Sequence, residues 1–222
     1  KILIYVDQNT KKIQVASAAL EYIENGQIIG IGSGSTVNCL IEQLDKVKSK
    51  IDAVVSSSEA TTKLVKSKNI RVIDLKESGR IPLYIDGADE SNQHKQLIKG
   101  GGGALTREKI VAHASDKFVC MIDDSKLVDT LGSFPLPIEV IGMSQSLVSL
   151  EMIKLGGRPV LRENYLTDNN NIIVDTHNLQ IQQPIKLEQE INNIPGVVTT
   201  GLFAMRGADI LLVSNGSNID EL

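Results

Sequence analysis

Short β-branched runs alternate with helix-forming stretches through the first 130 or so residues of this 222-residue chain. An amphipathic helix is expected over 11–24, where Asn25 and Gly26 end it. The strands expected after it lie near 27–31, 51–55, 70–73, 81–85 and 117–122. Because parallel strands need long crossover connections, the alternation predicts a largely parallel sheet with crossover helices. The last apolar run, 209–213, is expected to rejoin that sheet.

A different order of elements begins after Phe134, where Pro135 and Pro137 interrupt the alternation. The elements expected there are strand 137–141, helix 144–155, strand 158–162, strand 172–175, helix 184–194 and strand 197–202. This βαββαβ order is that of the ferredoxin-like split βαβ unit, which is large enough to form a small domain of its own.

Composition excludes several classes of protein. Hydrophobic residues make up 41% and charged residues 23% of the chain, as in ordinary globular proteins, and the net charge of -4 is scattered, so no nucleic-acid partner is expected. Cys39 and Cys120 lack CxxC spacing and are expected to be reduced core thiols in a cytoplasmic setting. Residues 1–6 are either a short strand or not native, and they are too short for a signal segment, so secretion is not expected. No apolar run reaches about 18 residues, so no membrane span is expected either.

Polar clusters follow four of the expected strands. The strands run into Gly32–Thr36, Ser56–Glu59, Asp86–Glu90 and Asp123–Lys126. In an open α/β sheet, ligands bind in the crevice beyond the carboxyl ends of the strands. The sequence therefore predicts a functional cleft at this edge.

The first loop, Gly32-Ser33-Gly34-Ser35-Thr36, combines glycines with the start of a helix, an arrangement that favours a bound anion such as phosphate. It lacks the Lys of a Walker A motif and the third glycine of GxGxxG, so it is not a nucleotide motif. The alternative interpretation is a tight turn in which Ser35 or Thr36 caps the helix.

The third loop, Asp86-Gly87-Ala88-Asp89-Glu90, holds three carboxylates in five residues. It is either a capped turn or a site where Asp86 and Asp89 meet sugar hydroxyls or a cation. His94, His113 and His177 do not have the spacing of metal ligands, so no catalytic metal is expected.

Four consecutive glycines, Gly100–Gly103, separate Lys99 from the start of a helix that carries Glu108. Ordering four glycines has a large entropic cost, which is tolerated where backbone amides must wrap an anion or substrate. A flexible linker explains the run poorly, because apolar helix-forming sequence follows at once. Taken alone, Glu108 would be a solvated surface residue.

These groups suit one reaction, the movement of a carbonyl between adjacent carbons of a phosphosugar. The reaction needs a base that shuttles a proton through an enediolate, a cation or amide for the oxyanion, and a group that helps to open the sugar ring. Glu108, Lys99 and the Asp86/Asp89 pair can fill these roles without a redox cofactor.

The motifs Gly-Ser-Gly-Ser-Thr, Ser-Ser-Ser-Glu, Asp-Gly-Ala-Asp-Glu, Lys-Gly-Gly-Gly, Leu-Thr-Arg-Glu-Lys and Gly-Gly-Arg-Pro occur in the order and spacing of one family. From about residue 8 onward the chain resembles ribose-5-phosphate isomerase A. The resemblance implies a homodimer or homotetramer, no metal or organic cofactor, and interconversion of ribose 5-phosphate and ribulose 5-phosphate. It also implies a Rossmann-like domain of residues 1–130 plus 207–222 and a smaller ferredoxin-like α/β domain of residues 131–206.

Carried over by residue, the resemblance makes Glu108 the proton acceptor, gives Lys99 the oxyanion and gives Asp86, beside Asp89, a part in ring opening. The substrate-binding residues it implies are Ser33, Gly34, Ser35, Thr36, Asp86, Gly87, Ala88, Asp89, Lys99, Gly100, Gly101, Gly102 and Lys126. Two departures are Ser33, where the family more often has Thr, and Gly103, which replaces a more usual Ala and is expected to add flexibility.

Two other functions remain as alternatives. A sugar-phosphate-sensing module would need affinity but no base, and a nucleotide-dependent oxidoreductase would need a dinucleotide fingerprint, which the chain lacks. The sequence does not decide between dimer and tetramer, how strictly five-carbon substrates are preferred, or which residues hold the phosphate.

Overall fold

The structure, a computed structural model, describes residues 6–222, so the interpretation of residues 1–6 falls almost wholly outside it. The chain divides into two compact units. Unit 1 contains the chain up to Gly87, Val111–Leu127 and Ala208–Leu222, and unit 2 contains Ala88–Ile110 and Val128–Gly207.

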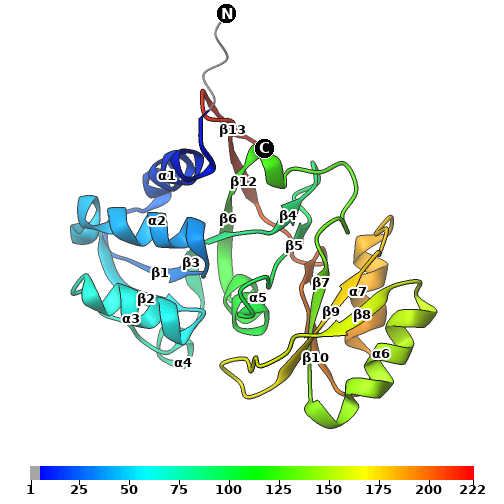
Figure 1. The fold of residues 1–222 in the computed structure, drawn as a ribbon. Coiled ribbons are helices and arrows are strands. Elements are labelled where there is room, and N and C mark those ends of the chain that lie inside the picture. The colour runs from blue at the N-terminus through cyan, green and yellow to red at the C-terminus, as the bar shows by residue number, and fades with distance from the viewer. Residues whose placement is uncertain (1–5) are drawn as a thin grey trace, which may run out of the picture. The chain divides into compact units, whose positions relative to one another are not determined.

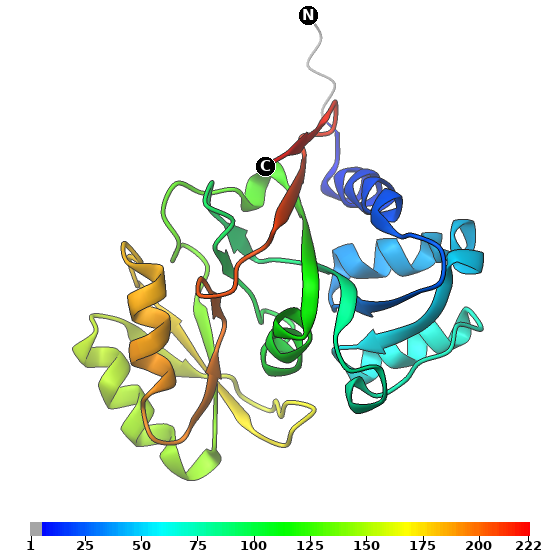
Figure 2. The same ribbon diagram turned by 180° about the vertical axis from the view of Figure 1, so that it is seen from behind.

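Unit 1 is a doubly wound α/β unit (Figure 1). Its elements are α1 (Gln8–Ala19), β1 (Gln27–Ile31), α2 (Ser35–Gln43), β2 (Ile51–Ser56), α3 (Glu59–Ser67), α4 (Leu75–Ser78), β3 (Ile81–Gly87), β6 (Ser115–Asp123), β12 (Ile210–Ser214) and β13 (Ile219–Glu221). The sheet order is β13-β12-β6-β3-β1-β2. Within this sheet, as far as the structure describes the chain, only β13 is antiparallel to its neighbour. The expected mostly parallel sheet is therefore confirmed, as is the return of the last apolar run, seen as β12 beside β6 in Figure 2.

The prediction of a strand at 70–73 is wrong. Only Val72 forms a bridge to the sheet, opposite Val54, and two backbone hydrogen bonds flank it, from the Val54 amide to Arg71 and from the Ile73 amide to Val54. The chain enters α4 at Leu75, so the apolar run ends before a ladder along β2 can form.

The first helix is displaced toward the N-terminus from its expected range of 11–24. It begins at Gln8 because the Asp7 carboxylate accepts a hydrogen bond from the Thr10 amide, 3.0 Å away, and so caps the first turn. The chain then tightens into a 3₁₀ turn, η1 (Leu20–Tyr22), and turns at Gly26, whose φ of 74° suits glycine. Val15, Ala16 and Ala19 form the buried face of this helix.

Unit 2 contains the predicted βαββαβ order. Its elements are β4 (Glu90–Ser91), β5 (Leu97–Ile98), β7 (Leu136–Val140), α6 (Gln145–Lys154), β8 (Arg158–Leu161), β9 (Ile172–His177), α7 (Pro184–Asn192), β10 (Val197–Thr200) and β11 (Leu202–Phe203). The four-stranded sheet has the order β10-β7-β9-β8, all antiparallel, and α6 and α7 lie side by side on one of its faces (Figures 1 and 2). This is the expected ferredoxin-like arrangement.

Residues 88–110 belong to unit 2, whereas the sequence interpretation had placed them in the first domain. The physical cause is a small sheet of order β11-β5-β4. Leu202 and Phe203 of β11 pair with Ile98 and Leu97 of β5, and the Lys99 amide donates to the Gly201 carbonyl at 2.8 Å. Helix α5 (Leu105–His113) continues from this segment back toward unit 1 along the chain.

Both units have buried apolar cores. In unit 1 the core is formed by one face of α1 and α2 and by the inner residues of the parallel strands. In unit 2 it is formed mainly by β7, β9, α6 and α7. Cys39 and Cys120 are both buried thiols, as expected from their apolar sequence neighbours.

Ser58 offers a test of the helix that follows β2. Its hydroxyl accepts a hydrogen bond from the Thr61 amide at 3.0 Å and so caps α3. Ser58→Ala should therefore lower the free energy of unfolding, measured by urea titration, by about 1–2 kcal/mol. Asp74 precedes α4 in the same way but makes no capping bond to any described residue. Asp74→Ala should therefore change the free energy of unfolding by less than about 0.5 kcal/mol. Equal losses in the two variants would contradict the capping role of Ser58.

Candidate active site

Lys99 and Glu108 meet inside unit 2. Lys99 follows β5, Glu108 lies in the first turn of α5, and the Lys99 Nζ is 3.2 Å from the Glu108 Oε2. Only 3% of the Lys99 side chain and 4% of the Glu108 side chain are exposed. The two groups that the sequence placed nine positions apart therefore form one buried ammonium–carboxylate pair, and Glu108 is not a solvated surface residue.

The glycine bend, Gly100–Gly103, brings the two side chains together. The Gly103 amide donates to the Gly100 carbonyl at 2.9 Å, which closes a tight turn between β5 and α5. The φ angles of Gly100 and Gly103 are 102° and 84°, values that side chains strongly disfavour. Glycine at both ends therefore lets the chain reverse in a few residues without backbone strain.

Asp89 is attached to the same bend. Its Oδ2 accepts from the Gly101 amide at 2.8 Å, and its own amide donates to the Ile98 carbonyl at 2.8 Å. Gly102 has a different environment, because a Cβ added there would meet no atom of the described residues within 4 Å. Unit 2 thus places Asp89, Lys99, Glu108 and an open backbone position, Gly102, around one turn.

A second buried cation lies beside this pair. Lys109 Nζ is 2.6 Å from Glu188 Oε1 and donates to the Leu202 carbonyl at 2.8 Å, while Lys99 and Lys109 lie 5.6 and 4.7 Å from the centre of the Phe203 ring. Burial lowers the pKa of Lys109, and the nearby Glu188 carboxylate partly offsets this. Sequence reasoning did not find Phe203 or Glu188, because their role depends on β11 pairing with β5.

Asp86 of unit 1 is fully buried at the end of β3. Its carboxylate accepts from the Ser33 amide at 3.1 Å, the Gly87 amide at 2.7 Å and the Tyr84 hydroxyl. A Cβ at Gly32 would lie 1.8 Å from the Asp86 Cγ, so this position must be glycine. Asp86 therefore joins the loop after β1 to the loop after β3.

The loop after β1 also fits the expected anion site. Gly34, with a φ of 98°, precedes α2, and Ser35 is the first residue of that helix. Lys12 of α1 donates from Nζ to the Ser35 Oγ at 3.0 Å. A cation thus lies beside a helix N-terminus, where free amides favour negative charge.

The sequence-derived residues fall into two groups by unit. In unit 1, Gly87 is the last residue of the parallel strand β3. Ser33–Thr36 follow the carboxyl end of β1, and Lys126 follows that of β6, in the 3₁₀ turn η4 (Asp124–Lys126). Ala88 is the first residue of unit 2, which also holds Asp89, Lys99–Gly102 and Glu108. Within each unit the structure brings the expected residues to the same loops.

None of the helices in residues 6–222 is both long and apolar enough to cross a membrane. A doubly wound sheet with polar loops at its carboxyl edge, and a buried carboxylate–ammonium pair beside a glycine bend, together define an α/β enzyme of acid–base chemistry.

Comparison with known proteins identifies the family. The family described as ribose 5-phosphate isomerase A (phosphoriboisomerase A) matches residues 53–218, and the description "DeoR C terminal sensor domain" matches residues 7–76. The curated ribose-5-phosphate isomerase A of Buchnera aphidicola subsp. Acyrthosiphon pisum (strain Tuc7) is 54% identical over 211 residues, which cover 95% of each chain.

Solved structures agree. Ribose 5 phosphate isomerase A from Neisseria gonorrhoeae is 45% identical, with a TM-score of 0.95 and 97% of each chain covered. A D-ribose-5-phosphate isomerase in complex with phospho-erythronic acid is 33% identical, with a TM-score of 0.91, and 98% of this chain and 99% of that chain are covered. The present chain belongs to the ribose 5-phosphate isomerase A family and is an aldose–ketose isomerase.

The buried pair can be tested by stability alone. Lys99→Met should lower the free energy of unfolding by about 3–5 kcal/mol, because it leaves the Glu108 charge buried without its cation. Glu108→Gln should also destabilise, and the double variant should lose much less than the sum of the two, as measured by urea denaturation. The exposed Lys154–Glu151 pair is the control, with an expected coupling of at most about 0.5 kcal/mol. Additive losses at positions 99 and 108 would show that the side chains do not interact.

Proposed function

We propose that the chain interconverts D-ribose 5-phosphate and D-ribulose 5-phosphate through an enediolate, with Glu108 as the base, in the non-oxidative branch of the pentose phosphate pathway. The observation that carries this proposal is the buried pair of Glu108 and Lys99, 3.2 Å apart beside the glycine bend. Family membership supports the substrate, since the relatives with the highest identity reported above are named for ribose 5-phosphate.

In the proposed reaction, Glu108 removes the proton from C2 of the open-chain aldose, and the electron pair forms the C1–C2 double bond. Negative charge then develops on the former carbonyl oxygen at C1, where the Lys99 ammonium stabilises it. Glu108 returns its proton to C1, while the O2 hydroxyl becomes the new carbonyl and its proton passes to O1. One carboxylate therefore serves both half-reactions, and no electrons leave the sugar.

Asp86 and Asp89 are proposed to bind sugar hydroxyls, with Asp86 helping to open the ring. The two carboxylates differ in how many hydrogen bonds they accept from the protein. Asp86 accepts from three donors of unit 1, so its replacement would also disturb the Gly32–Ser33 turn. Among the residues that the structure describes, the Asp89 carboxylate accepts from the Gly101 amide, and the side chain is only half-buried. Asp89 is therefore the better position for testing hydroxyl binding.

For the phosphate we propose the loop Ser33–Thr36, with Lys126 as a further contact. The loop carries the amides at the start of α2, and Lys12 lies against Ser35. This cation and helix start suit a dianionic group. Which of these residues dominates is a matter for measurement with phosphate-free ribose as the comparison ligand.

A homodimer or homotetramer is proposed as well. Exposed apolar residues gather on α6 and the turn before it, with exposed fractions of 95% for Met143, 44% for Leu147, 58% for Leu150 and 56% for Ile153. Such a helix face is typical of a surface that is covered in an assembly. Sedimentation equilibrium distinguishes the two assemblies. A cytoplasmic location is proposed from the two buried thiols and the metabolic role.

Turnover in EDTA distinguishes a metal-independent isomerase from a sugar-phosphate sensor and from a metal enzyme. Residues 7–76 match a sensor domain, but that segment ends before Asp86, Lys99 and Glu108, the groups of the proposed chemistry. Ribose 5-phosphate should be converted to the ketose in EDTA. Binding without turnover would support a sensor, and loss of turnover on chelation would indicate a metal enzyme.

Glu108→Gln tests the base. The amide is nearly isosteric but cannot accept the proton, so we expect turnover of ribose 5-phosphate to fall by at least about 100-fold while the substrate still binds. Deuterium exchange at C2 of the sugar in D₂O should be lost in parallel. A variant that loses substrate binding but keeps the wild-type rate in the bound state would contradict the assignment.

Gly102→Ala tests whether the glycine bend binds substrate. A methyl group there meets no described atom within 4 Å, and Gly102 does not have a positive φ, so the thermal midpoint should change by less than about 2 °C. If the substrate approaches the backbone at this point, the Michaelis constant should rise by about tenfold or more. Gly142→Ala, equally unobstructed, is the control. Unchanged kinetics in Gly102→Ala would exclude close approach at this bend.

A further inference from the structure

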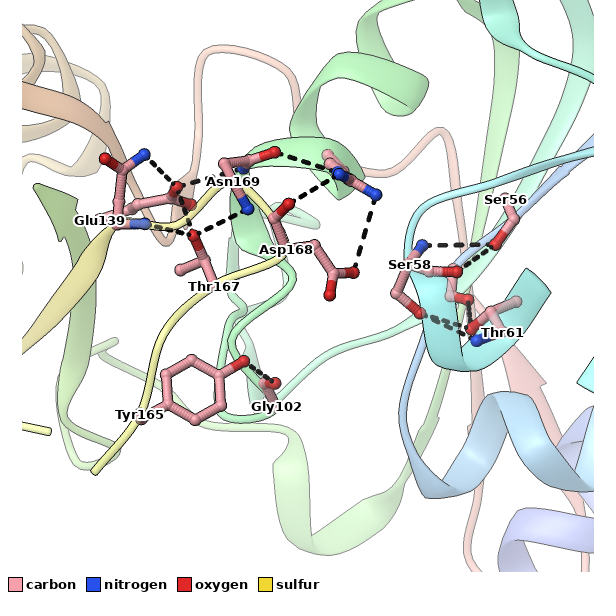
Figure 3. Close-up of polar contacts among 12 residues, drawn as sticks. Ser56, Ser58, Thr61, Gly102, Glu139, Tyr165, Thr167, Asp168 and Asn169 are labelled. Carbon is pink, nitrogen blue, oxygen red and sulfur yellow. Dashed lines mark hydrogen bonds and ion pairs between the residues drawn. The ribbon is translucent and has the colours of Figure 1, made fainter. Parts of the chain in front are cut away.

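The loop between β8 and β9, residues 162–171, contacts the glycine bend and the start of α5 within unit 2 (Figure 3). We call it the β8–β9 loop. None of its residues was among the candidate site residues found from sequence, because about 60 residues separate the loop from the glycine bend along the chain.

The far end of this loop is fixed by Glu139 of β7, which is fully buried. Its carboxylate accepts from Thr167 Oγ1 at 2.9 Å, Asn169 Nδ2 at 3.1 Å and Asn171 Nδ2 at 2.9 Å. It also accepts from the hydroxyl of Thr106, two residues before Glu108 in α5. The loop and the helix that carries the proposed base are therefore joined to one buried carboxylate.

Arg107 makes a second connection between that helix and the loop. Its Nε donates to the Asn169 Oδ1 at 3.0 Å, and its Nη2 donates to the Asp168 carbonyl at 2.9 Å (Figure 3). The side chains of Glu139 and Arg107 thus hold residues 167–171 in place, so the preceding residues of the loop extend from a fixed segment.

The near end of the loop holds the glycine bend. The Arg162 guanidinium donates to the carbonyls of Gly100 and Gly101, each at 3.2 Å, and is itself paired with Asp175 at 2.6 and 2.8 Å. Its Cζ lies 5.3 Å from the centre of the Tyr165 ring. Arg162 therefore fixes the first two carbonyls of the bend and supports Tyr165.

Tyr165 holds the third carbonyl. Its hydroxyl donates to the Gly102 carbonyl at 3.0 Å (Figure 3), and burial raises the pKa of Tyr165, an effect that Arg162 partly opposes, so the hydroxyl keeps its proton at neutral pH. A Cβ added at Gly103 would lie 1.9 Å from this hydroxyl oxygen. The glycine at position 103 therefore provides space for Tyr165 and adopts a positive φ, and the expectation that it merely adds flexibility is corrected.

We propose that Tyr165 is a positioning residue of this enzyme, whose hydroxyl occupies the space left by the absent side chain of Gly103 and fixes the Gly102 carbonyl, so that the glycine bend is ordered before substrate binds. The inference rests on the proposed function, since it takes the bend as part of the substrate site. Four glycines have wide conformational freedom, and ordering them in advance removes an entropic cost from binding.

The test compares Tyr165→Phe with Tyr22→Phe under steady-state conditions with ribose 5-phosphate. Tyr22 of unit 1 also donates one hydroxyl hydrogen bond, to Glu221 at 2.8 Å, and serves as the matched control. Tyr165→Phe should raise the Michaelis constant about 2-fold to 10-fold, the value of one neutral hydrogen bond, with kcat changed less than about 2-fold. Tyr22→Phe should leave both constants unchanged.

A double-variant cycle tests the shared space. Gly103→Ala should lower kcat/KM by on the order of tenfold or more in the wild-type background, because the methyl group displaces the tyrosine. In the Tyr165→Val background, which removes the obstructing hydroxyl, the same substitution should cost only about 2-fold to 3-fold, the remainder reflecting backbone strain at the positive φ.

Two results would overturn the inference: a wild-type Michaelis constant in Tyr165→Phe, whether or not its thermal midpoint falls, or additive effects at positions 103 and 165. A wild-type chain that does not turn over ribose 5-phosphate would instead overturn the proposed function, and with it the substrate role of Tyr165. The two failures are therefore distinguishable.

Discussion

The ion pair between Lys99 and Glu108 is the constraint on which the rest of unit 2 depends. Removing two charges from water costs several kcal/mol per ion, and the cost is offset only where the partners are held in good geometry. At 3.2 Å and almost fully buried, this pair meets that condition because β5 is held between β4 and β11 and because the glycine bend returns the chain directly into α5. The ion pair and the small sheet therefore constrain each other.

Other buried charges of unit 2 serve the same geometry. The Lys109–Glu188 pair holds α5 and α7 to β11, since Glu188 also accepts from the amides of Ala204 and Met205. Glu139 joins the start of α5 to the β8–β9 loop. Each carboxylate has several donors, which is how a buried charge becomes tolerable and how a polar network specifies one arrangement. The proposed base thus lies on a helix that is fixed at several points.

In unit 1 the constraint is different. The parallel strands carry the loops after β1, β3 and β6 to the same edge of the sheet, and the order β2-β1-β3-β6-β12 reverses direction between β1 and β3. Ligand sites of doubly wound sheets lie at such a point. Asp86 uses its carboxylate to join the two loops that flank it, so electrostatic crowding among the carboxylates after β3 is relieved by backbone amides and a tyrosine hydroxyl.

The sequence by itself determined the elements and their order, because periodicity and turn residues act locally. It identified β1, the parallel sheet, the βαββαβ order, and the motifs at Asp86, Lys99 and Glu108. It misjudged 70–73, where the chain turns into α4 before a ladder along β2 can form, and it assigned residues 88–110 to the wrong unit, since pairing of β5 with β11 joins residues about 100 positions apart. Tertiary structure alone decided that Lys99 and Lys109 both lie over the Phe203 ring, that Arg162 holds the glycine bend, and that Gly103 leaves room for Tyr165. Such contacts are set by side-chain packing between distant segments, and no local pattern records them.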